Sequence, residues 1–412
     1  MNKRFLFISL ILFLGFLPVN FVSAQQITIS GILVDDETEE PLAFASVGIK
    51  GETSGTITNN SGEFDFHVQE VLKDKILTVS MLGYENYEKE ISQINYSKTI
   101  IIRLKKIPQI LDEVTIKDSL SGADIIEVAL NRLSINYADK PYLLNGFYRD
   151  IKSVNNTYIS LLESAIQVFD NNHEKPRNPF KLREKVGLIQ VRKSLGYNHK
   201  YIGYFDQGNL LEILLLNNNI RYYDFPLSEN TNSYLRKGKS LLDNNEVYII
   251  QLRNKGVRMK IYVDINTYAI VRLEYESDYD ENILNVNKHY KDYFNRFVKL
   301  SKIIEYKNHN GKYYLHYMTM YKRSQWYHKD SKTLDYDVEL YQELLINDIN
   351  PNTSRRINSA LRMKKYGLQY QDQPYEPKFW ENYNVIKRTL LDQKIIDDLE
   401  REGNLEQQFK GY

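Results

Sequence analysis

The chain of 412 residues contains no cysteine. It can therefore form neither a disulfide framework nor a thiolate metal site, and it has no cysteine to carry a lipid anchor. Histidine is scarce, with seven residues, and no two of them have His-x-x-x-His spacing. A Gly-x-Ser-x-Gly segment and a phosphate-binding glycine-rich loop are also absent. From the sequence we assign no catalytic, cofactor-binding or metal-binding residue, and no binding residue can be named.

One histidine has a spacing known from zinc peptidases. His67 precedes Glu70 by three positions, which is the His-x-x-Glu spacing of zinc carboxypeptidases. Catalytic zinc needs three protein ligands, and residues three apart on a strand point to opposite faces. We interpret His67 as a partly exposed strand residue. We expect no peptidase and, more generally, no enzyme.

Neither sign of charge dominates the composition. The chain has 54 Lys and Arg residues and 53 Asp and Glu residues. A nearly neutral protein lacks the basic surface that nucleic acids or anionic headgroups require. We expect no nucleic-acid partner, and we consider other envelope proteins or an apolar ligand as partners.

A long apolar run occurs only at the N-terminus. Lys3 and Arg4 precede an apolar stretch from Phe5 to Phe16, and small residues at Val22-Ser23-Ala24 follow. This pattern predicts a cleaved signal peptide over residues 1–24. A transmembrane anchor is the alternative, but it needs roughly 20 apolar residues. We therefore expect an exported bacterial protein, in the periplasm or at a face of the outer membrane, that is not a lipoprotein and whose mature chain has no transmembrane segment.

Residues 27–105 show the pattern of a small antiparallel β-sandwich. Apolar and polar residues alternate in five short runs, at 27–34, 44–50, 63–68, 75–81 and 98–104. Asn60-Ser61-Gly62 suits a tight turn, because Asn and Gly tolerate positive φ. Phe64 and Phe66, two positions apart, are expected on one face of the following strand.

The residues of this region resemble a known domain family. The matching positions are Gly31, Asp35, Pro41-Leu42, Gly55-Thr56, Thr58–Phe64 and Gly83-Tyr84. They are similar to the carboxypeptidase regulatory-like domain, a transthyretin-like or immunoglobulin-like sandwich found in Bacteroidetes envelope proteins. Asn59 departs from the family, where Asp is usual; this keeps the turn chemistry and removes a charge. The resemblance implies a non-catalytic accessory domain.

A short segment after the sandwich resembles part of a receptor. Leu111–Ile116 is similar to the segment that follows this domain in Bacteroidetes TonB-dependent receptors, before the plug and barrel. Only 296 residues follow Ile116, which we consider too few for such a barrel with its plug. We interpret residues 106–120 as a linker, with a TonB-contacting segment as the alternative.

Residues 121–350 are expected to form a helix followed by a large β domain. Ser121 and Asp124 have capping-box spacing ahead of an apolar helical stripe. Three strands at 246–252, 257–263 and 269–275 are expected to form a meander, and strands at 297–307 and 312–321 a hairpin across Asn310-Gly311. The pattern predicts a mainly β protein with some α structure: a sandwich, then a large antiparallel curved sheet or half-barrel with covering helices.

Further resemblances concern this second region. Three segments look like Bacteroidetes proteins of unknown function that carry the same sandwich: Gly146–Asp150, Leu162–Ala165 and Phe379–Asn384. Separately, Lys260–Thr267 and the strand after it resemble the half-barrel of periplasmic lipoprotein carriers, which implies a curved sheet over an apolar cavity.

Residues 351–412 are expected to form a tail that packs on the β domain. From Asn352 onward the pattern predicts a polar helix, a loop and a second helix. Asp392 can begin a short helix with Ile395 and Leu399 facing inward, and Gly403 can end it. A helix that docks on a partner is the alternative reading of this tail.

Two function classes follow. The first is a non-catalytic cell-envelope binding or assembly protein, with the sandwich as an adaptor and the β domain as a binding body. The second is a periplasmic carrier of a lipid or other apolar ligand. The first predicts a sheet face closed by large side chains, and the second predicts a continuous apolar cavity with bound lipid. A TonB-system accessory or an unrecognised hydrolase ranks third.

Overall fold

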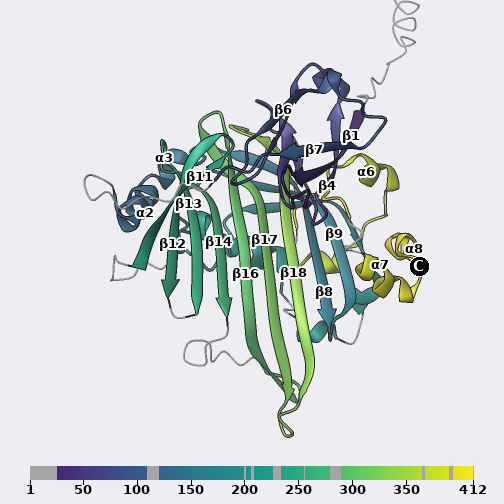
Figure 1. The fold of residues 1–412 in the computed structure, drawn as a ribbon. Helices are drawn as coiled ribbons and strands as arrows, with labels where there is room; N and C mark the ends of the chain where they lie inside the picture. The colour runs from purple at the N-terminus through teal and green to yellow at the C-terminus, as the bar shows by residue number, and fades with distance from the viewer. Residues whose placement is uncertain are drawn as a thin grey trace, which may run out of the picture.

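The computed structural model describes nine segments of the chain. These are residues 26–108, 120–198, 201–205, 208–225, 233–254, 256–278, 289–363, 367–388 and 393–411. The predicted signal peptide and the segment Leu111–Ile116 lie outside them. Figure 1 shows a small N-terminal β domain at one end of a large sheet, with C-terminal helices along one side of that sheet.

The N-terminal domain is a sandwich of two sheets around its own core. Its seven strands are β1 Gln26–Asp35, β2 Ser46–Ile49, β3 Gly55–Ile57, β4 Glu63–Gln69, β5 Ile76–Ser80, β6 Tyr87–Glu90 and β7 Ile100–Leu104. One sheet has the order β4-β1-β7 and the other β3-β2-β5-β6. The pairing of β1 with β7 is parallel, which corrects the expected wholly antiparallel sandwich. The first and last strands of the domain run side by side in the same direction.

The turn before β4 sets the inward face of that strand. Asn59 Oδ1 accepts the backbone N–H groups of Ser61 and Glu63, and Gly62 has a φ of 72°. Phe64 and Phe66 are both fully buried on one face, as expected from the alternation. A side chain at Gly31 would lie 2.4 Å from the Phe64 ring, so the first strand needs glycine where the ring crosses it.

The second domain is built on one open antiparallel sheet. Its strands are β8 Tyr142–Val154, β9 Thr157–Asp170, β10 Lys185–Lys193, β11 Tyr234–Leu242, β12 Asn245–Asn254, β13 Val257–Asp264, β14 Ile270–Asp278, β15 His289–Tyr290, β16 Tyr293–His309, β17 Lys312–His328 and β18 Leu334–Asn350. The order is β10-β9-β8-β18-β17-β16-β14-β13-β12-β11, with β15 paired to β16. The expected fold class, mainly β with a sandwich followed by a large antiparallel sheet, is confirmed. The sheet is not closed.

The expected meander and hairpin are present in this sheet. Strands β12, β13 and β14 pair in sequence, and β16 pairs with β17 across the two-residue turn Asn310-Gly311. Both turn residues have positive φ, 50° and 81°, as the commonest two-residue hairpin turn requires. The strands of the hairpin are longer than expected, because the pairing continues to His328.

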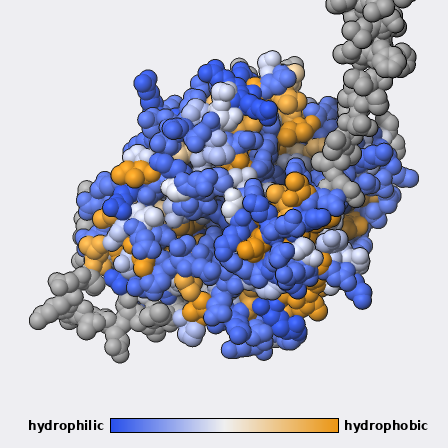
Figure 2. All heavy atoms as spheres, turned by 90° about the horizontal axis from the view of Figure 1, so that it is seen from above, coloured by the Kyte–Doolittle hydropathy of each residue, from blue (hydrophilic) through white to orange (hydrophobic). Residues whose placement is uncertain are grey.

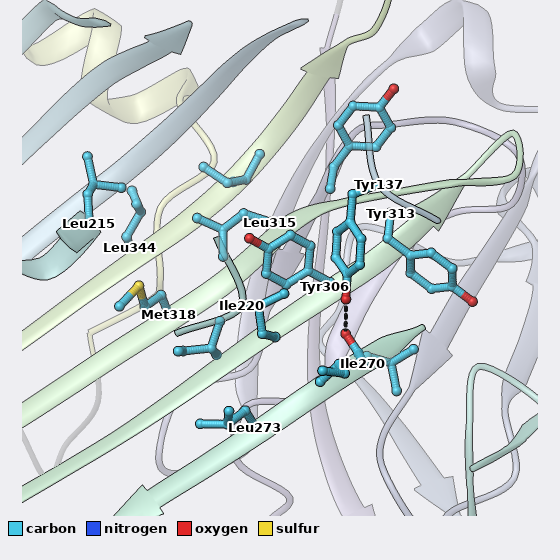
Figure 3. Close-up of a cluster of buried hydrophobic side chains, with 14 of the residues drawn as sticks. Tyr137, Leu215, Ile220, Ile270, Leu273, Tyr306, Tyr313, Leu315, Met318 and Leu344 are labelled. Atoms are coloured by element: carbon cyan, nitrogen blue, oxygen red, sulfur yellow. Dashed lines mark hydrogen bonds between the residues drawn. The ribbon is translucent and has the colours of Figure 1, made fainter. Parts of the chain in front are cut away.

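Helices cover one face of the sheet, which we call the helix face. They are α2 Gly122–Asn131, α3 Leu133–Asn136, α4 Leu210–Leu216 and α5 Asn219–Tyr222. Ser121 and Asp124 form the expected capping box at the start of α2. Large apolar side chains from helices and strands interdigitate on this face, and the Tyr137 hydroxyl donates to Ile270 O at 2.6 Å (Figure 3). Side chains therefore fill the space between helices and sheet in the part drawn there.

The opposite face, which we call the docking face, carries the sandwich and the end of the chain (Figure 1). The C-terminal helices are α6 Pro377–Asn382, α7 Gln393–Leu399 and α8 Leu405–Lys410. Ile395 and Leu399 of α7 are buried, as expected, and pack with Leu161 of β9. Gly403, with a φ of 110°, separates α7 and its last turn from α8.

The polar helix expected from Asn352 onward is wrong. Residues 351–363 form turns and extended backbone along β10, the edge strand of the large sheet. Leu188 N–H donates to Leu361 O, and Met363 N–H donates to Val186 O. Ile357 is buried against Leu143 and Phe169. An edge strand has unpaired backbone groups, and covering them outweighed the local helical pattern.

Among the described residues, no helix is long and apolar enough to cross a membrane. Seen from above, the surface is mostly hydrophilic, with small hydrophobic groups separated from one another (Figure 2).

Candidate binding site at the junction of sandwich and sheet

The three segments singled out in the second region converge in space. Gly146–Asp150 lies in β8 and Leu162–Ala165 in β9, where Arg149 pairs with Glu163 and Tyr148 with Ser164. Phe379–Asn384 comprises most of α6 and the residues after it, and Trp380 packs with Phe147 and Ala165. More than 200 residues separate the third segment from the first two in sequence, so only the fold brings it to them.

A buried ion-pair network occupies the docking face at this point. Arg149 donates to Glu163 at 2.9 Å, to Glu343 at 2.8 Å and to the backbone oxygen of Ile386 at 2.8 Å. Glu163 also accepts from Arg192 at 2.6 Å and from Arg388 at 2.7 Å. Its side chain is 0% exposed. Each charge in this network has an opposite partner, as buried charges require.

The electrostatics of the network keep Glu163 ionised. Burial by itself would raise the pKa of this carboxyl group, but the guanidinium groups of Arg192, Arg388 and Arg149 hold it well below its usual range. The Arg192 guanidinium also lies 4.2 Å from the centre of the Trp380 ring. The network is therefore a fixed ionic contact between strands β8, β9, β10 and the C-terminal segment.

A second buried pair lies on the helix face of the same strand. Lys152 Nζ is 2.5 Å from Asp150 Oδ1, and both side chains are almost completely buried. Asp150 also accepts from the Tyr148 hydroxyl, which in turn accepts from Gln342. Burial lowers the pKa of Lys152, and the Asp150 carboxylate opposes that shift. A cavity of about 720 Å³ adjoins Lys152 near the edge strand β10.

Residues 384–388 connect the sandwich to the sheet, and we call them the clasp. The Asn384 side chain accepts from His67 N–H at 2.8 Å and donates to His67 O at 3.2 Å. Lys387 forms an ion pair with Asp65 at 3.0 Å. On the sheet side, Ile386 O accepts from Arg149, and Arg388 donates to Glu163. The clasp thus bonds to β4 of the sandwich and to β8 and β9 of the sheet.

A cavity of about 370 Å³ opens beside the clasp, and we call it the junction cavity. All three parts of the chain line it. The sandwich contributes Phe44, Asn59 and Asn60; the sheet contributes Arg149, Ile151, Ser153, Tyr158, Tyr321, Glu339, Tyr341 and Glu343; the C-terminal segment contributes Ile386, Lys387 and Ile395. A neighbouring hollow of about 470 Å³ on the docking face shares Phe44, Tyr321 and Tyr341 with it. The junction cavity is of ligand size and combines aromatic rings with a few polar groups, as binding sites do.

The structure places His67 where the sequence analysis expected it. It lies in β4 with its Nδ1 2.9 Å from Thr28 Oγ1, and its backbone is held by Asn384. Two other histidines, His173 and His316, are buried, and burial lowers the pKa of each. Within the described segments, no group of three or more His, Asp or Glu side chains could hold a metal ion.

No residue of the junction cavity was predicted from the sequence as a binding residue. Tyr321, Glu339, Tyr341 and Glu343 lie on long strands whose positions on the docking face are mostly polar or aromatic, so their sequence pattern resembles that of a solvated strand face. One signal was available. Glu339, Tyr341 and Glu343 alternate with the buried residues Val338, Leu340 and Leu344, which places the former set on one face.

Comparison with known proteins identifies the first domain. Residues 29–116 match the model of the CarboxypepD_reg-like domain family. A stretch of 94 residues is 40% identical to the TonB-dependent receptor SusC of Bacteroides thetaiotaomicron. That stretch is 23% of this chain and 8% of the receptor. The resemblance to the carboxypeptidase regulatory-like domain of Bacteroidetes is confirmed, and it supports a cell-envelope setting.

Two solved structures show weak similarity to this chain. One is a structure of lipovitellin, titled for its lipid–protein interactions. The matched region covers 57% of this chain and 28% of the lipovitellin chain, with 10% sequence identity and a TM-score of 0.27. A putative membrane-associated protein of unknown function from Bacteroides fragilis covers 79% of this chain and 98% of its own at 9% identity, with a TM-score of 0.16. At these TM-scores we draw no argument from either structure.

Proposed function

We propose that this chain is a non-catalytic cell-envelope protein in which the sandwich is an adaptor and the open sheet is the binding body. The family match of residues 29–116 supports the adaptor role, because a domain of this kind also occurs in a receptor of much greater length. The buried charges at the junction are held in pairs, which supports a structural role for them.

The observation that carries this proposal is the clasp. Residues 384–388 bond to the sandwich through Asn384 and Lys387 and to the sheet through Ile386 and Arg388. Apolar contacts add to these bonds, because Ile57 of the sandwich is buried with Phe147, Tyr317 and Leu345 of the sheet. A domain tied by chain connectivity alone would make few such contacts. These contacts hold the sandwich in one orientation relative to the sheet. An adaptor needs such a fixed orientation to present the binding body.

The lipid carrier is the second candidate, and one observation weighs against it. On the helix face, where a carrier would hold acyl chains, side chains such as Leu215, Ile220, Tyr306 and Met318 fill the space under the helices (Figure 3). A filled face is the arrangement that the binding or assembly class predicts.

Native mass spectrometry of the purified mature chain, combined with solvent extraction, tests the two candidates. We expect the mass of the polypeptide alone and no acyl lipid in the extract. A stoichiometric acyl lipid in both measurements would contradict the proposal and favour the carrier. A variant that fills the helix face further, Ala129→Leu in α2, would then be expected to reduce the bound lipid. Asn131→Leu, at an exposed position of the same helix, serves as its control.

A further inference from the structure

We infer that the junction cavity binds a small organic cation, an alkyl- or arylammonium ion, with Glu339 as its counter-ion. The inference concerns a ligand, whereas the proposed adaptor role concerns how the two domains are held. Four aromatic residues line the cavity: Phe44, Tyr158, Tyr321 and Tyr341. Aromatic rings together with a carboxylate are the chemistry that recognises ammonium groups.

Glu339 is the carboxylate in this cavity with the weakest cationic partner. It accepts hydrogen bonds from two neutral hydroxyl groups, Tyr321 at 2.8 Å and Ser153 at 3.1 Å. Its ion-pair partner, Arg323, lies 4.0 Å away and is much closer to Asp337, at 2.5 Å. Glu343, in contrast, is bonded to Arg149 at 2.8 Å. The Glu339 side chain is 36% exposed, so a ligand can reach it.

The two cations that line the cavity do not oppose this assignment. Arg149 is bonded to Glu163 and Glu343, and Lys387 is paired with Asp65 outside the cavity. Both positive charges are therefore compensated by carboxylates. Lys394, which does not line the cavity, has its Nζ 4.9 Å from the centre of the Tyr158 ring. A protein ammonium group already contacts an aromatic face of this site.

Phe44 supplies a second, independent indication. Its φ is 62°, a conformation that a bulky residue other than glycine rarely adopts. The strain places its ring at the cavity, 5.8 Å from the Tyr317 ring in a stacked arrangement. Strained residues of this kind persist where the surrounding structure holds them, and they cluster at binding sites. Phe44 is thus held at the cavity wall, between sandwich and sheet.

The hydroxyl groups of Tyr321 and Ser153 hold the Glu339 carboxylate in place. Burial and the hydrogen bond to Glu339 raise the pKa of Tyr321 well above its usual range, so its hydroxyl stays a donor at every physiological pH. These two donors occupy one acceptor position on each carboxylate oxygen, and the remaining lone pairs are left for a ligand N–H. The volume of about 370 Å³ lies at the lower end of the range for small-molecule sites, which suits a single amine of modest size.

Isothermal titration calorimetry of the mature chain tests the inference with three ligands. All three carry a phenyl ring on a two-carbon chain and differ in the charge of the end group. Phenethylammonium is the cation, phenethyl alcohol the neutral analogue and 3-phenylpropionate the anion. We expect the cation to bind at one site per chain, the alcohol to bind at least about tenfold more weakly, and the anion to give no heat. Equal binding of cation and alcohol, preference for the anion, or no heat with any ligand would overturn the inference.

Variants locate the site. Glu339→Gln keeps an oxygen acceptor for Tyr321, and its Nε2 can donate to Ser153 Oγ; we expect the loss of the charge to weaken cation binding at least about tenfold. Phe44→Gly removes the ring and the strain together, so the fold is retained, and cation binding falls several-fold. Glu246→Gln, which changes a solvent-accessible carboxylate that does not line the cavity, leaves binding unchanged. Binding that is unaffected in both Glu339→Gln and Phe44→Gly would place the cation elsewhere and refute the assignment. The proposed function is tested by the lipid content of the purified chain, and the cation site by calorimetry, so either proposal can fail without the other.

Discussion

Asn59 shows how one substitution keeps a turn and changes its surroundings. Its Oδ1 accepts from two backbone N–H groups, a role that an Asp carboxylate could also fill, and its Nδ2 donates to Glu63 at 3.1 Å. An Asp at this position would place a second carboxylate beside Glu63 and lose that donor. The uncharged side chain of Asn59 therefore suits its neighbour, because its amide donates to the Glu63 carboxylate instead of repelling it. This local compensation could not be recognised until the Glu63 side chain was placed.

Glu163 provides the prediction at the residue scale. Because it is fully buried among Arg149, Arg192 and Arg388, Glu163→Gln removes the carboxylate and leaves three guanidinium groups with less negative charge. We expect the free energy of unfolding to fall by about 3–5 kcal/mol at pH 7, measured by urea denaturation.

The pH dependence has a defined sign. The pKa of Glu163 is depressed in the folded state, so its contribution is complete above the unfolded-state pKa of about 4.3 and is lost as the pH falls further. The stability difference between the native chain and Glu163→Gln should shrink as the pH is lowered below that value. Exposed Glu246→Gln should change stability by less than about 0.5 kcal/mol. A difference that is constant from pH 7 to pH 3 would contradict the ionised state of Glu163.

At the scale of elements, two edge strands, β4 of the sandwich and β10 of the large sheet, are each covered by a segment without regular secondary structure. β4 is the edge of its three-stranded sheet, and the Asn384 amide bonds there to the N–H and C=O of His67. β10 is the edge of the large sheet, and residues 361–363 bond to it. A side chain in one case and a backbone in the other satisfy groups that would otherwise be open to another chain.

Asn384→Leu tests the edge contact. The variant removes both hydrogen bonds to His67 without changing the apolar contacts of Ile386. We expect faster hydrogen exchange at the His67 amide, by roughly tenfold, which corresponds to about 1.4 kcal/mol of lost protection. Asn382→Leu, two residues away and exposed, should leave this exchange rate unchanged. Unaltered exchange in Asn384→Leu would show that the clasp does not hold this edge.

At the scale of the whole molecule, the C-terminal segment makes two domains behave as one. The clasp, α6 and the apolar contact of Ile57 bring residues from the start, middle and end of the chain into one interface. Contacts of this number predict a single cooperative unfolding transition.

Truncation tests this coupling. A chain that ends at Tyr383 lacks the clasp, and calorimetry should then resolve two transitions, one for the sandwich and one for the sheet. A chain that ends at Leu399 keeps the clasp and loses α8, including the buried side chains of Leu405 and Phe409, and it should retain one transition at lower temperature. A single transition in the Tyr383 truncation would show that the sandwich is held to the sheet without the clasp.

Local patterns were sufficient for the elements that are stabilised locally. The capping box at Ser121, the Asn310-Gly311 turn and the alternation of Phe64 and Phe66 each depend on residues a few positions apart, and each was predicted. The expected helix after Asn352 failed for the opposite reason. Its residues are held by β10, whose edge lies more than 160 residues earlier in the chain.

The sequence by itself determined the identity of the sandwich, the antiparallel class of the large sheet and the positions of several strands, because turn chemistry and alternation are short-range properties. Only the tertiary structure decided that Arg149, Glu163 and Arg388 share one buried network and that Phe44, Tyr321 and Glu339 line one cavity. Contacts over such sequence separations depend on which strands become neighbours and on which face the C-terminal segment returns. No local pattern in the sequence carries that information.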